Sequence, residues 1–416
     1  MNGRLLALLV SLASLTGAPA AALDFSADER ARILSHGPWP PASWPDASNR
    51  VDGRPAAVEL GRRLFSDPAL SASGRLACAS CHQPARAFTD GRAVARGERN
   101  TPSLLDAGQR RWFGWDGAHD SLWSASLAPM LAAHEIAATP AALAARLQHD
   151  RDLGRRYRAL FGVPQGDEAL AVNLAKALAA YQATLLSSRS PFDAFRDALA
   201  RGDVRTAARY PEAAQRGLRL FIGRGRCSVC HAGPLFSNGE FADIGRPFFV
   251  ASGVDSGRWG GIVRLQASRT NRLGELSDAR PGDARAVGTR HVLLEPRHFG
   301  EFKVPGLRQL VQTAPYMHDG SLATIEAVVQ HYSGLDEERL HADGERILRA
   351  LNLDGGEAAD LAAFLRSLSG PLTVAATDRR RRSAPRRRRG SSRWPRRRGR
   401  RCGSVRCRTA ANGCAR

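Results

Sequence analysis

Two five-residue stretches decide the fold class of this 416-residue chain: Cys78-Ala79-Ser80-Cys81-His82 and Cys227-Ser228-Val229-Cys230-His231. Both have the pattern Cys-x-x-Cys-His, which attaches a c-type haem. The cysteine sulfurs tether the porphyrin, and the histidine lies under the iron as its proximal ligand. With seven cysteines and eleven histidines in the chain, chance predicts far fewer than one match. The sequence therefore predicts two covalently bound haem c groups, attached through Cys78, Cys81 and His82 and through Cys227, Cys230 and His231.

Other interpretations of the paired cysteines explain the pattern less well. A disulfide or a thioredoxin-like redox pair leaves the histidine that follows each pair without a role. A zinc site would need both pairs to share one metal ion. The remaining cysteines, Cys402, Cys407 and Cys414, lie in an arginine-rich C-terminal stretch and match no such pattern.

The sequence around the two haem motifs repeats. Upstream lie Gly61-Arg62-Arg63-Leu64-Phe65 and Gly217-Leu218-Arg219-Leu220-Phe221, and downstream lie Phe88-Thr89-Asp90-Gly91 and Phe236-Ser237-Asn238-Gly239. Each copy predicts a helix that ends in Leu-Phe, a loop that carries the motif, and a turn. The two motifs are about one domain length apart. We therefore expect two cytochrome c-like haem domains related by an internal repeat, over residues 23–205 and 206–372.

Hydrophobic periodicity predicts a mainly α fold with weak strand signals. The segments with helical spacing of apolar residues are 127–147, 169–186, 325–332 and 358–368. Residues 193–204 are charged and are expected to form an exposed connection. Residues 250–298 are rich in glycine and arginine, which predicts a long irregular insertion in the second domain. Aromatic residues make up only 6% of the chain, so we expect the haems to replace part of the usual core.

The N-terminus has the three parts of a secretory signal peptide. Arg4 supplies a positive charge, residues 5–15 form a short apolar run, and Ala18-Pro19-Ala20 and Ala20-Ala21-Ala22 offer small-residue cleavage sites. The apolar run is far shorter than the roughly 20 residues of a spanning helix. We expect residues 1–22 to be removed and the mature protein, which has no predicted membrane span, to be periplasmic.

The formal net charge of +21 comes mainly from the C-terminus. Residues 379–416 contain 17 arginines and no acidic residue, which leaves +4 for the remaining 378 residues. Such a segment buries too little apolar surface to fold, so residues 373–416 are predicted to be a disordered tail. We interpret the tail as a solvated or out-of-frame extension. A nucleic-acid partner is not expected, because an exported protein rarely meets one.

The ligand opposite each proximal histidine decides between electron transfer and catalysis. No histidine or methionine occurs in residues 83–118, so the first haem has no axial candidate directly after its motif. Later candidates are His119, Met130 and His134, each of a type more often found in the core or on the surface than as a ligand. Glu135 is the best carboxylate for acid–base work here, although the residues alone favour an exposed helix charge.

The sequence resembles the bacterial di-haem cytochrome c peroxidases and the MauG-type enzymes of methylamine utilisation. The resemblance covers residues 59–368 and rests on the two haem motifs and on further motifs in the same order. These motifs are Phe88-Thr89-Asp90-Gly91-Arg92, Arg99-Asn100-Thr101-Pro102-Ser103-Leu104, Trp115-Asp116-Gly117, Phe302-Lys303-Val304-Pro305-Gly306-Leu307-Arg308 and Thr313-Ala314-Pro315-Tyr316-Met317-His318-Asp319-Gly320.

The resemblance implies roles for matching residues. It implies that His82 and His231 are the proximal ligands of a peroxide-reacting haem and an electron-storing haem. It also implies that Trp115 relays electrons between the haems and that Glu135 is the distal acid–base residue. A calcium ion between the haems is implied as well, on oxygen atoms that suit a hard cation. Its ligands would be Asn100, Thr313 and Pro315.

One departure from the family's cytochrome c peroxidases concerns the second haem. Those enzymes place an axial methionine fourteen residues after the histidine of Tyr-x-His-Asp-Gly. The same position here is Tyr332, as in MauG-type enzymes, so we expect Tyr332 to be the axial ligand. A tyrosine ligand stabilises oxidised iron relative to methionine. The neighbouring His331 ranks second, and Met317 is expected to pack against other residues.

Two further departures concern the first haem. The histidine that closes this site in resting peroxidases has no counterpart here, which indicates a permanently open site. The family's distal glutamine is replaced by Ala125, so the distal pocket is altered and peroxide activation is expected to be weaker or different.

The resemblance implies a peroxidase-type oxidoreductase that reduces hydrogen peroxide at the first haem with electrons relayed through the second. Its donor would be a small cytochrome c or a cupredoxin. Two alternatives stay open: a MauG-type enzyme that oxidises side chains of a protein substrate during cofactor maturation, and a non-catalytic electron-transfer cytochrome. A homodimer also stays open.

Overall fold

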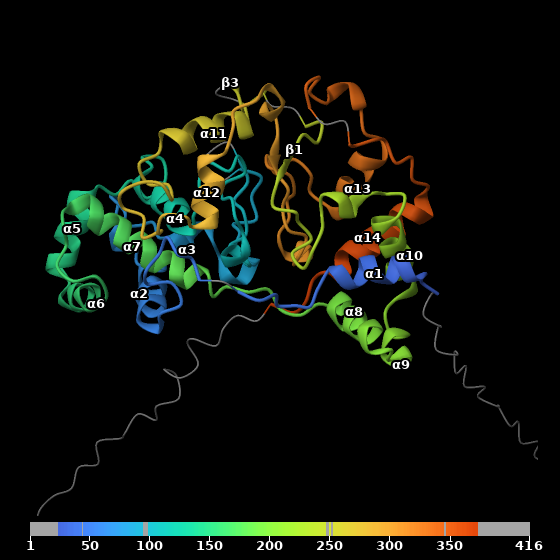
Figure 1. The fold of residues 1–416 in the computed structure, drawn as a ribbon, viewed down its shortest axis with the longest axis horizontal. Helices are drawn as coiled ribbons and strands as arrows, with labels where there is room; N and C mark the ends of the chain where they lie inside the picture. Colours follow the sequence, from blue (N-terminus) through green and yellow to red (C-terminus); the bar gives the residue numbers. More distant parts are fainter. Residues whose placement is uncertain are drawn as a thin grey trace, which may run out of the picture. The chain divides into compact units, whose positions relative to one another are not determined.

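The structure is a computed structural model that describes residues 24–43, 45–94, 99–246, 249–250, 253–344 and 347–372 (Figure 1). These residues belong to one compact unit and are mainly helical, as the sequence predicts. No helix among them combines the length and the hydrophobicity needed to cross a membrane. The predicted signal peptide (1–22) and arginine-rich tail (373–416) lie outside the described residues.

Helices of one to four turns account for most of the regular structure. The α-helices are α1 (Ala27–Ser35), α2 (Pro55–Phe65), α3 (Cys78–Cys81), α4 (Leu122–Leu131), α5 (Pro140–His149), α6 (Arg151–Phe161), α7 (Asp167–Gln182), α8 (Pro191–Arg201), α9 (Val204–Ala207), α10 (Glu212–Ile222), α11 (Arg258–Ala267), α12 (Ala284–Arg290), α13 (Ile325–Ser333) and α14 (Gly355–Ser367). Single 3₁₀ turns lie at Pro68–Leu70, Pro84–Arg86, Ala107–Gln109, Cys227–Val229, Pro296–His298, Leu310–Gln312 and Glu337–Arg339.

Strands are short and pair locally. They are β1 (Phe241–Ala242), β2 (Phe249–Val250), β3 (Gly253–Val254) and β4 (Phe302–Lys303). β1 pairs with β4 in antiparallel register, with Phe241 opposite Lys303. β2 pairs with β3 in the same sense. The β1–β4 pair matters for the site, because it holds Lys303 at a defined position beside the second haem motif.

The hydrophobic core forms two clusters of buried side chains. The first cluster draws on α2, α4, α5, α6 and α7, and its members run from Val51 to Ala180. α7 lies at its centre, where it contacts α2, α4 and α5 (Figure 1). Because α7 is buried on nearly all sides, its Ala/Leu-rich sequence is apolar around the whole helix and not along one stripe.

The second cluster draws on α1, α8, α10, α13 and α14 and is rich in phenylalanine. α10 and α14 form its closest helix pair, with α13 against α14 (Figure 1). Phe25 and Ile33 near the N-terminus also pack into this cluster. α1 and α8, which the predicted division at residue 205 assigns to the first domain, therefore pack with the second cluster. The domain boundary itself stays a prediction.

The repeated glycines ahead of the two haem motifs lie where helices cross closely. A Cβ atom added to Gly61 in α2 would approach the Ala177 carbonyl oxygen of α7 to 2.0 Å. A Cβ atom added to Gly217 in α10 would approach the Asp360 carbonyl oxygen of α14 to 1.9 Å. Each glycine thus permits a backbone contact that any side chain would block.

Three local predictions need correction. The helix expected over residues 127–147 is two helices, α4 and α5, because Thr139 caps a new helix that begins at Pro140. The connection expected over 193–204 contains α8, which begins in a capping box between Ser190 and Asp193. The segment 250–298, expected to be irregular, contains α11 and α12.

Asp193 is not a solvated charge but half of a buried ion pair, which explains the wrong prediction around α8. Its carboxylate accepts two hydrogen bonds of 2.9 Å from Arg308, and the two side chains are 2% and 3% exposed. The Arg308 guanidinium also lies over the Trp39 ring at 3.6 Å and donates to the Pro234 carbonyl oxygen at 2.6 Å. The pair joins α8 to the segment after β4, and the bond to Pro234 extends the connection to the loop after the second haem motif.

We expect Asp193→Ala to lower the free energy of unfolding of the holoprotein by about 3–5 kcal/mol, because it leaves a guanidinium buried without its counter-ion. Urea unfolding followed by circular dichroism measures the effect. Asp197→Ala on the same helix is the control. Its carboxylate pairs with Arg196 and Arg189 near the surface, so a loss of about 1 kcal/mol or less is expected. Equal losses in the two variants would contradict this account.

Candidate haem sites

The histidines of the two motifs are oriented in the same way. The Nδ1–H of His82 donates to the Phe88 carbonyl oxygen at 3.0 Å, and that of His231 donates to the Phe236 carbonyl oxygen at 2.9 Å. Such a bond fixes the ring and its tautomer and leaves the Nε2 lone pair for a metal. Burial lowers the pKa of both imidazoles, which keeps them in the neutral form that binds iron.

Both accepting carbonyls belong to a phenylalanine with left-handed backbone. Phe88 has φ 59° and Phe236 has φ 54°, a conformation that is uncommon for residues other than glycine. Phe236 is fully buried in the second cluster, where its ring stacks on His36 at 4.5 Å. Phe88 packs against the first cluster. Packing of the two rings therefore holds the carbonyls that orient His82 and His231.

None of the four motif cysteines forms a disulfide, so all four are available for haem attachment. Cys78 and Cys81 bracket the short helix α3, and Cys227 begins the equivalent 3₁₀ turn. The backbone N–H of each motif histidine donates to the carbonyl oxygen of the first cysteine at 2.9 Å, which closes the motif into one turn. Burial raises the pKa of Cys78 and Cys227 to about 12, so both are neutral. Thiols and imidazole from one turn are the donor set that a c-type haem requires.

A cavity of about 620 Å³ adjoins the second motif. Its wall includes Cys227, Cys230 and His231, and on α13 it includes Val329 and Tyr332. The thiols, the imidazole and a phenol thus line one cavity whose wall is largely apolar, which fits a covalently attached haem.

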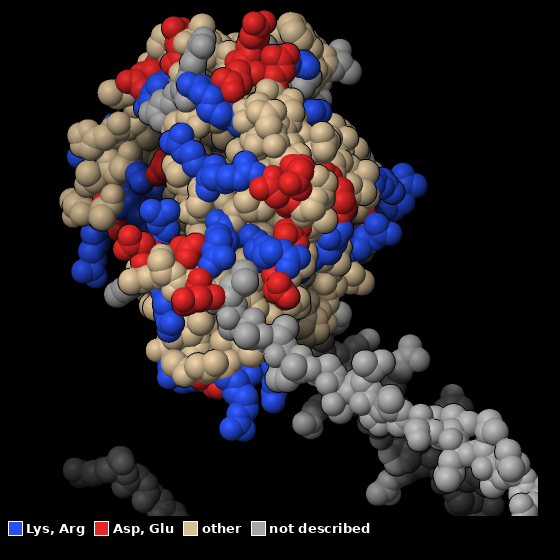
Figure 2. Space-filling model, turned by 90° about the vertical axis from the view of Figure 1, so that its right-hand side faces the viewer, with Lys and Arg blue, Asp and Glu red and all other residues tan. Residues whose placement is uncertain are grey.

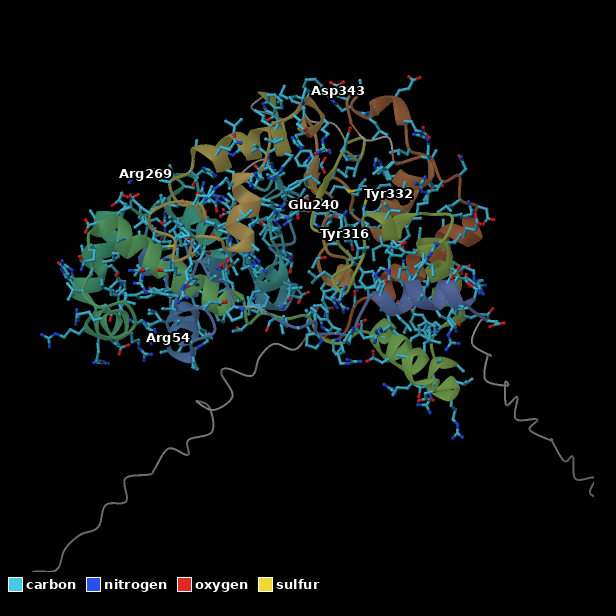
Figure 3. All side chains as sticks on the ribbon, in the orientation of Figure 1. Arg54, Glu240, Arg269, Tyr316, Tyr332 and Asp343 are labelled. Atoms are coloured by element: carbon cyan, nitrogen blue, oxygen red, sulfur yellow. The ribbon has the colours of Figure 1, made fainter. Side chains whose placement is uncertain are left out.

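Tyr332, and not His331, lies on the wall of this cavity. Figure 3 shows Tyr332 on α13. Burial raises the pKa of its phenol, with Cys227 and Cys230 as the next contributions, so the group is neutral without a metal. The Nε2–H of His331 instead donates to the Ile244 carbonyl oxygen at 2.9 Å. Met317 also lines the cavity.

Trp115 and the three candidate calcium ligands lie on the same cavity wall. The Trp115 indole N–H donates to the Asn100 carbonyl oxygen at 2.8 Å. The Asn100 side-chain amide donates to the Arg92 carbonyl oxygen at 2.8 Å, which leaves its Oδ1 to face elsewhere. Thr313 and Pro315 line the cavity with Asn100. The structure therefore brings together four residues that are up to 215 positions apart in sequence.

Glu135 lies near the first motif, in the turn between α4 and α5. Its carboxylate is one of the charges that raise the pKa of Cys78, although burial of that thiol is the larger cause. The Glu135 side chain is 41% exposed and lies 3.6 Å from the Nε2 atom of His134, which is 62% exposed. The residues alone favoured an exposed charge on a helix for Glu135. The structure instead places Glu135 in a turn beside the first motif.

The other axial candidates of the first haem have different surroundings. The Nδ1 atom of His119 is paired with the Ser124 hydroxyl at 3.1 Å. Met130 is buried in the first cluster, and Ala125, at the position of the family's distal glutamine, packs against that cluster. Neither Met130 nor Ala125 lines the cavity beside the second motif.

An ion-pair network supports the loop that carries Trp115. Arg99 bridges Asp116 at 2.5 Å and Asp255 at 2.6 Å, and Arg264 also pairs with Asp116. Burial opposes ionisation of Asp116, but Arg99 and Arg264 outweigh it and hold the pKa of its carboxyl at about 2. The arginine and the aspartate of two separate family motifs thus bind one another beside Trp115.

Sequence reasoning missed three polar residues on the cavity wall: Arg110, Lys303 and His318. Both ring nitrogens of His318 are buried without a partner, and its ring stacks on Phe302 at 3.4 Å. Lys303 and His318 occur inside the motifs that carry the family resemblance. Their presence there was the available signal, although nothing in the sequence alone showed that they face one cavity.

Comparisons with known proteins agree with this geometry. Residues 55–201 match the family described as di-haem cytochrome c peroxidase. The chain is 32% identical over 352 residues to cytochrome-c peroxidase IdrP2 of Pseudomonas sp. (strain SCT), covering 82% of this chain and 87% of the relative. It is 31% identical over 340 residues to methylamine utilization protein MauG of Methylophilus methylotrophus, covering 78% and 87%.

A solved structure is also similar. It is that of a MauG-like protein associated with microbial copper homeostasis, which matches with a TM-score of 0.60 and 28% identity. The match covers 82% of this chain and 98% of that protein. The likeness therefore extends over nearly the whole of the relative.

Proposed function

This chain belongs to the family of di-haem cytochrome c peroxidases and MauG enzymes, and from that premise we propose that it reduces hydrogen peroxide at an open haem site on the first motif. It is a di-haem oxidoreductase of the peroxidase type, and the family carries two c-type haems. Two observations on the same motif carry the proposal. The ring of His82 is oriented by its bond to Phe88, and the carboxylate of Glu135 lies close enough to Cys78 to raise the pKa of that thiol.

The residues that would hold the haems follow from the donor sets. Cys78, Cys81 and His82 would hold the first group. Cys227, Cys230 and His231 would hold the second, with Tyr332 as its axial ligand. When bound, the first haem supplies an iron that reacts with peroxide and the second stores an oxidising or reducing equivalent.

Glu135 and Trp115 supply the protein's own chemistry in this proposal. Glu135 accepts a proton from one peroxide oxygen and donates it to the other, so that the second oxygen leaves as water when the O–O bond breaks. The partial exposure of Glu135 lets it exchange protons with solvent between turnovers. Trp115 offers an oxidisable ring on the cavity wall, held by its bond to Asn100, and relays electrons between the two motifs.

The experiment that tests this function measures peroxide-dependent oxidation of a reduced small cytochrome c or cupredoxin by the purified holoprotein. Two donor equivalents should be oxidised for each peroxide, because peroxide takes two electrons and two protons to form two waters. Donor oxidation no faster than in protein-free buffer would overturn the assignment of a small donor.

A second candidate is a MauG-type enzyme that oxidises side chains of a protein substrate during cofactor maturation. The specific observation in its favour is Tyr332 on the cavity wall, at the position where MauG-type enzymes have their axial tyrosine. This candidate predicts that peroxide is consumed but that small donor proteins are oxidised slowly.

We also propose the organisation and location that the sequence predicts. The matched turns around His82 and His231 and the matched crossing glycines support two cytochrome c-like units related by an internal repeat. Haem c attachment and the signal-like N-terminus support export to the periplasm.

A calcium ion on Asn100, Thr313 and Pro315 is part of the proposal. Isothermal calorimetry of chelator-treated holoprotein should find one Ca²⁺ site per chain. Asn100→Ala should weaken binding by no less than the 10–100-fold that loss of an outer-shell partner typically causes. Asn238→Ala, on the same cavity wall, is the control and should leave affinity unchanged. Equal affinity in all three proteins, or no binding heat, would contradict the site.

A further inference from the structure

Basic side chains are unusually frequent on the wall of the cavity beside the second motif, and most of them have a carboxylate partner. Arg308 pairs with Asp193 at 2.9 Å, and Arg349 pairs with Glu337 at 3.3 Å. Further pairs are Arg224 with Glu357 and, at 3.9 Å, Arg111 with Glu240. These cations are compensated before any ligand enters the cavity.

Lys303 is different. The β1–β4 pair and a 2.7 Å hydrogen bond from its backbone N–H to the Trp115 carbonyl oxygen fix its position. Its ammonium group donates to the Trp112 carbonyl oxygen at 3.3 Å, a neutral partner. Among the residues that the structure describes, no carboxylate lies within 4.0 Å of that ammonium group.

Arg110 also lacks a carboxylate partner in the described part of the chain. Its guanidinium donates to the carbonyl oxygens of Ser103 at 3.0 Å and Leu105 at 2.6 Å. The carboxylate of Asp106 acts on the pKa of Arg110 through its charge. It accepts a hydrogen bond from the Ser187 backbone N–H at 2.7 Å, however, and forms no ion pair with Arg110 in the described part of the chain. Neutral carbonyls orient the guanidinium without neutralising it.

The two cations also act on each other. Burial, followed by the charge of Arg110, lowers the pKa of Lys303 to about 7. Burial likewise lowers the pKa of Arg110. Buried charges are normally paired, because an unpaired one loses its hydration without compensation. Asp106 and Asp116 act on these two cations without forming an ion pair with either. Two neighbouring cations that share a cavity and have no ion-pair partner among the described residues indicate that a negatively charged ligand completes the site.

We propose that Lys303 and Arg110 form a carboxylate-binding site for the propionate groups of the haem attached to Cys227 and Cys230. A haem brings two carboxylates into this cavity, one for each of these two cations. Arg226 also lines the cavity and forms no ion pair among the described residues, but it is exposed to solvent. Covalent attachment also gives these carboxylates a high effective concentration at the site. The inference rests on the two haems of the family and not on the peroxide chemistry proposed above.

The test measures the reduction potential of each haem by spectroelectrochemistry of the holoprotein. Removing a positive charge beside the propionates favours the oxidised haem, which carries one more positive charge than the reduced form. Lys303→Met should therefore shift the second haem's equilibrium about tenfold toward the oxidised form, which is a fall of ~59 mV for a one-electron couple. Arg110→Met should act in the same direction.

Two further variants make the result specific. Lys303→Arg retains the charge and should keep the potential near that of the unaltered protein. Arg349→Met removes a cation of the same cavity wall that is already paired with Glu337, so a smaller shift is expected. Equal shifts for Lys303→Met and Arg349→Met, or no shift for Lys303→Met and Arg110→Met, would overturn the proposal.

A separate arm distinguishes the propionate from a free carboxylate ligand. Acetate is titrated into the unaltered holoprotein against chloride at constant ionic strength. A site filled by propionate predicts no change in the second haem's potential, whereas a shift with acetate would show a site open to free carboxylates and overturn the propionate assignment. Neither the potential measurements nor the acetate titration uses peroxide. A failure of the propionate proposal can therefore be distinguished from a failure of the proposed peroxidase activity.

Discussion

Glu135→Gln is expected to slow the reaction of the holoprotein with hydrogen peroxide by about 10²–10⁴-fold, the usual contribution of a positioned acid–base group. Glutamine has nearly the same size but cannot accept the peroxide proton and return it to the departing oxygen. Both haems should remain attached, because Glu135 is not part of either Cys-x-x-Cys-His motif. Stopped-flow absorbance of the Soret band measures the second-order rate constant.

The neighbouring His134 provides a matched control. It is more exposed than Glu135 and lies 3.6 Å from its carboxylate, so His134→Gln replaces the side chain beside the carboxylate without removing the proposed catalytic group. Its rate constant should stay within a few-fold of that of the unaltered protein. If Glu135→Gln reacted as fast as His134→Gln, Glu135 would have no place in the mechanism.

Tyr332→Met is expected to raise the reduction potential of the second haem by a substantial part of the ~0.8 V range that axial ligands span. A phenolate or phenol oxygen stabilises the oxidised iron, whereas a thioether stabilises the reduced iron. The buried position of Tyr332 strengthens the effect, because little solvent screens the ligand from the metal. Spectroelectrochemical titration and the near-infrared band of methionine-ligated haem give two readouts.

His331→Gln is the control for this prediction. His331 adjoins Tyr332 on α13, but its Nε2 atom is bonded to the Ile244 carbonyl oxygen and the residue is not on the cavity wall. The potential of the second haem should therefore change little. A large shift in His331→Gln together with no shift in Tyr332→Met would exchange the two residues' roles.

Haem attachment could be predicted from the sequence because its chemistry is local. The cysteines and the histidine of each motif are five consecutive residues, and one turn of backbone brings them together. The helices α7, α13 and α14 could be predicted for a similar reason, since their apolar spacing or composition is continuous. Gly61 and Gly217 marked the repeat in sequence, and the structure gives the reason as two close helix crossings.

What could not be predicted depends on contacts between distant residues. Asp193 reads as a surface charge until its partner Arg308, 115 positions later, is placed beside it. The acidic and basic residues of 250–298 likewise gain meaning only from pairs such as Arg264 with Asp116. Lys303 was visible inside a family motif, but its lack of a counter-ion is a property of the folded cavity. Figure 2 shows basic and acidic side chains interspersed over one face of the molecule. The sequence gives the number of these charges but not which of them form ion pairs.

Low-temperature electron paramagnetic resonance of the resting, fully oxidised holoprotein tests the central claim most directly. If the first iron is bound by His82 and open on its other face, one high-spin ferric signal should accompany the signal of the second haem. The high-spin signal should be lost on addition of one equivalent of hydrogen peroxide. Two low-spin signals that do not respond to peroxide would contradict the account and leave an electron carrier in its place.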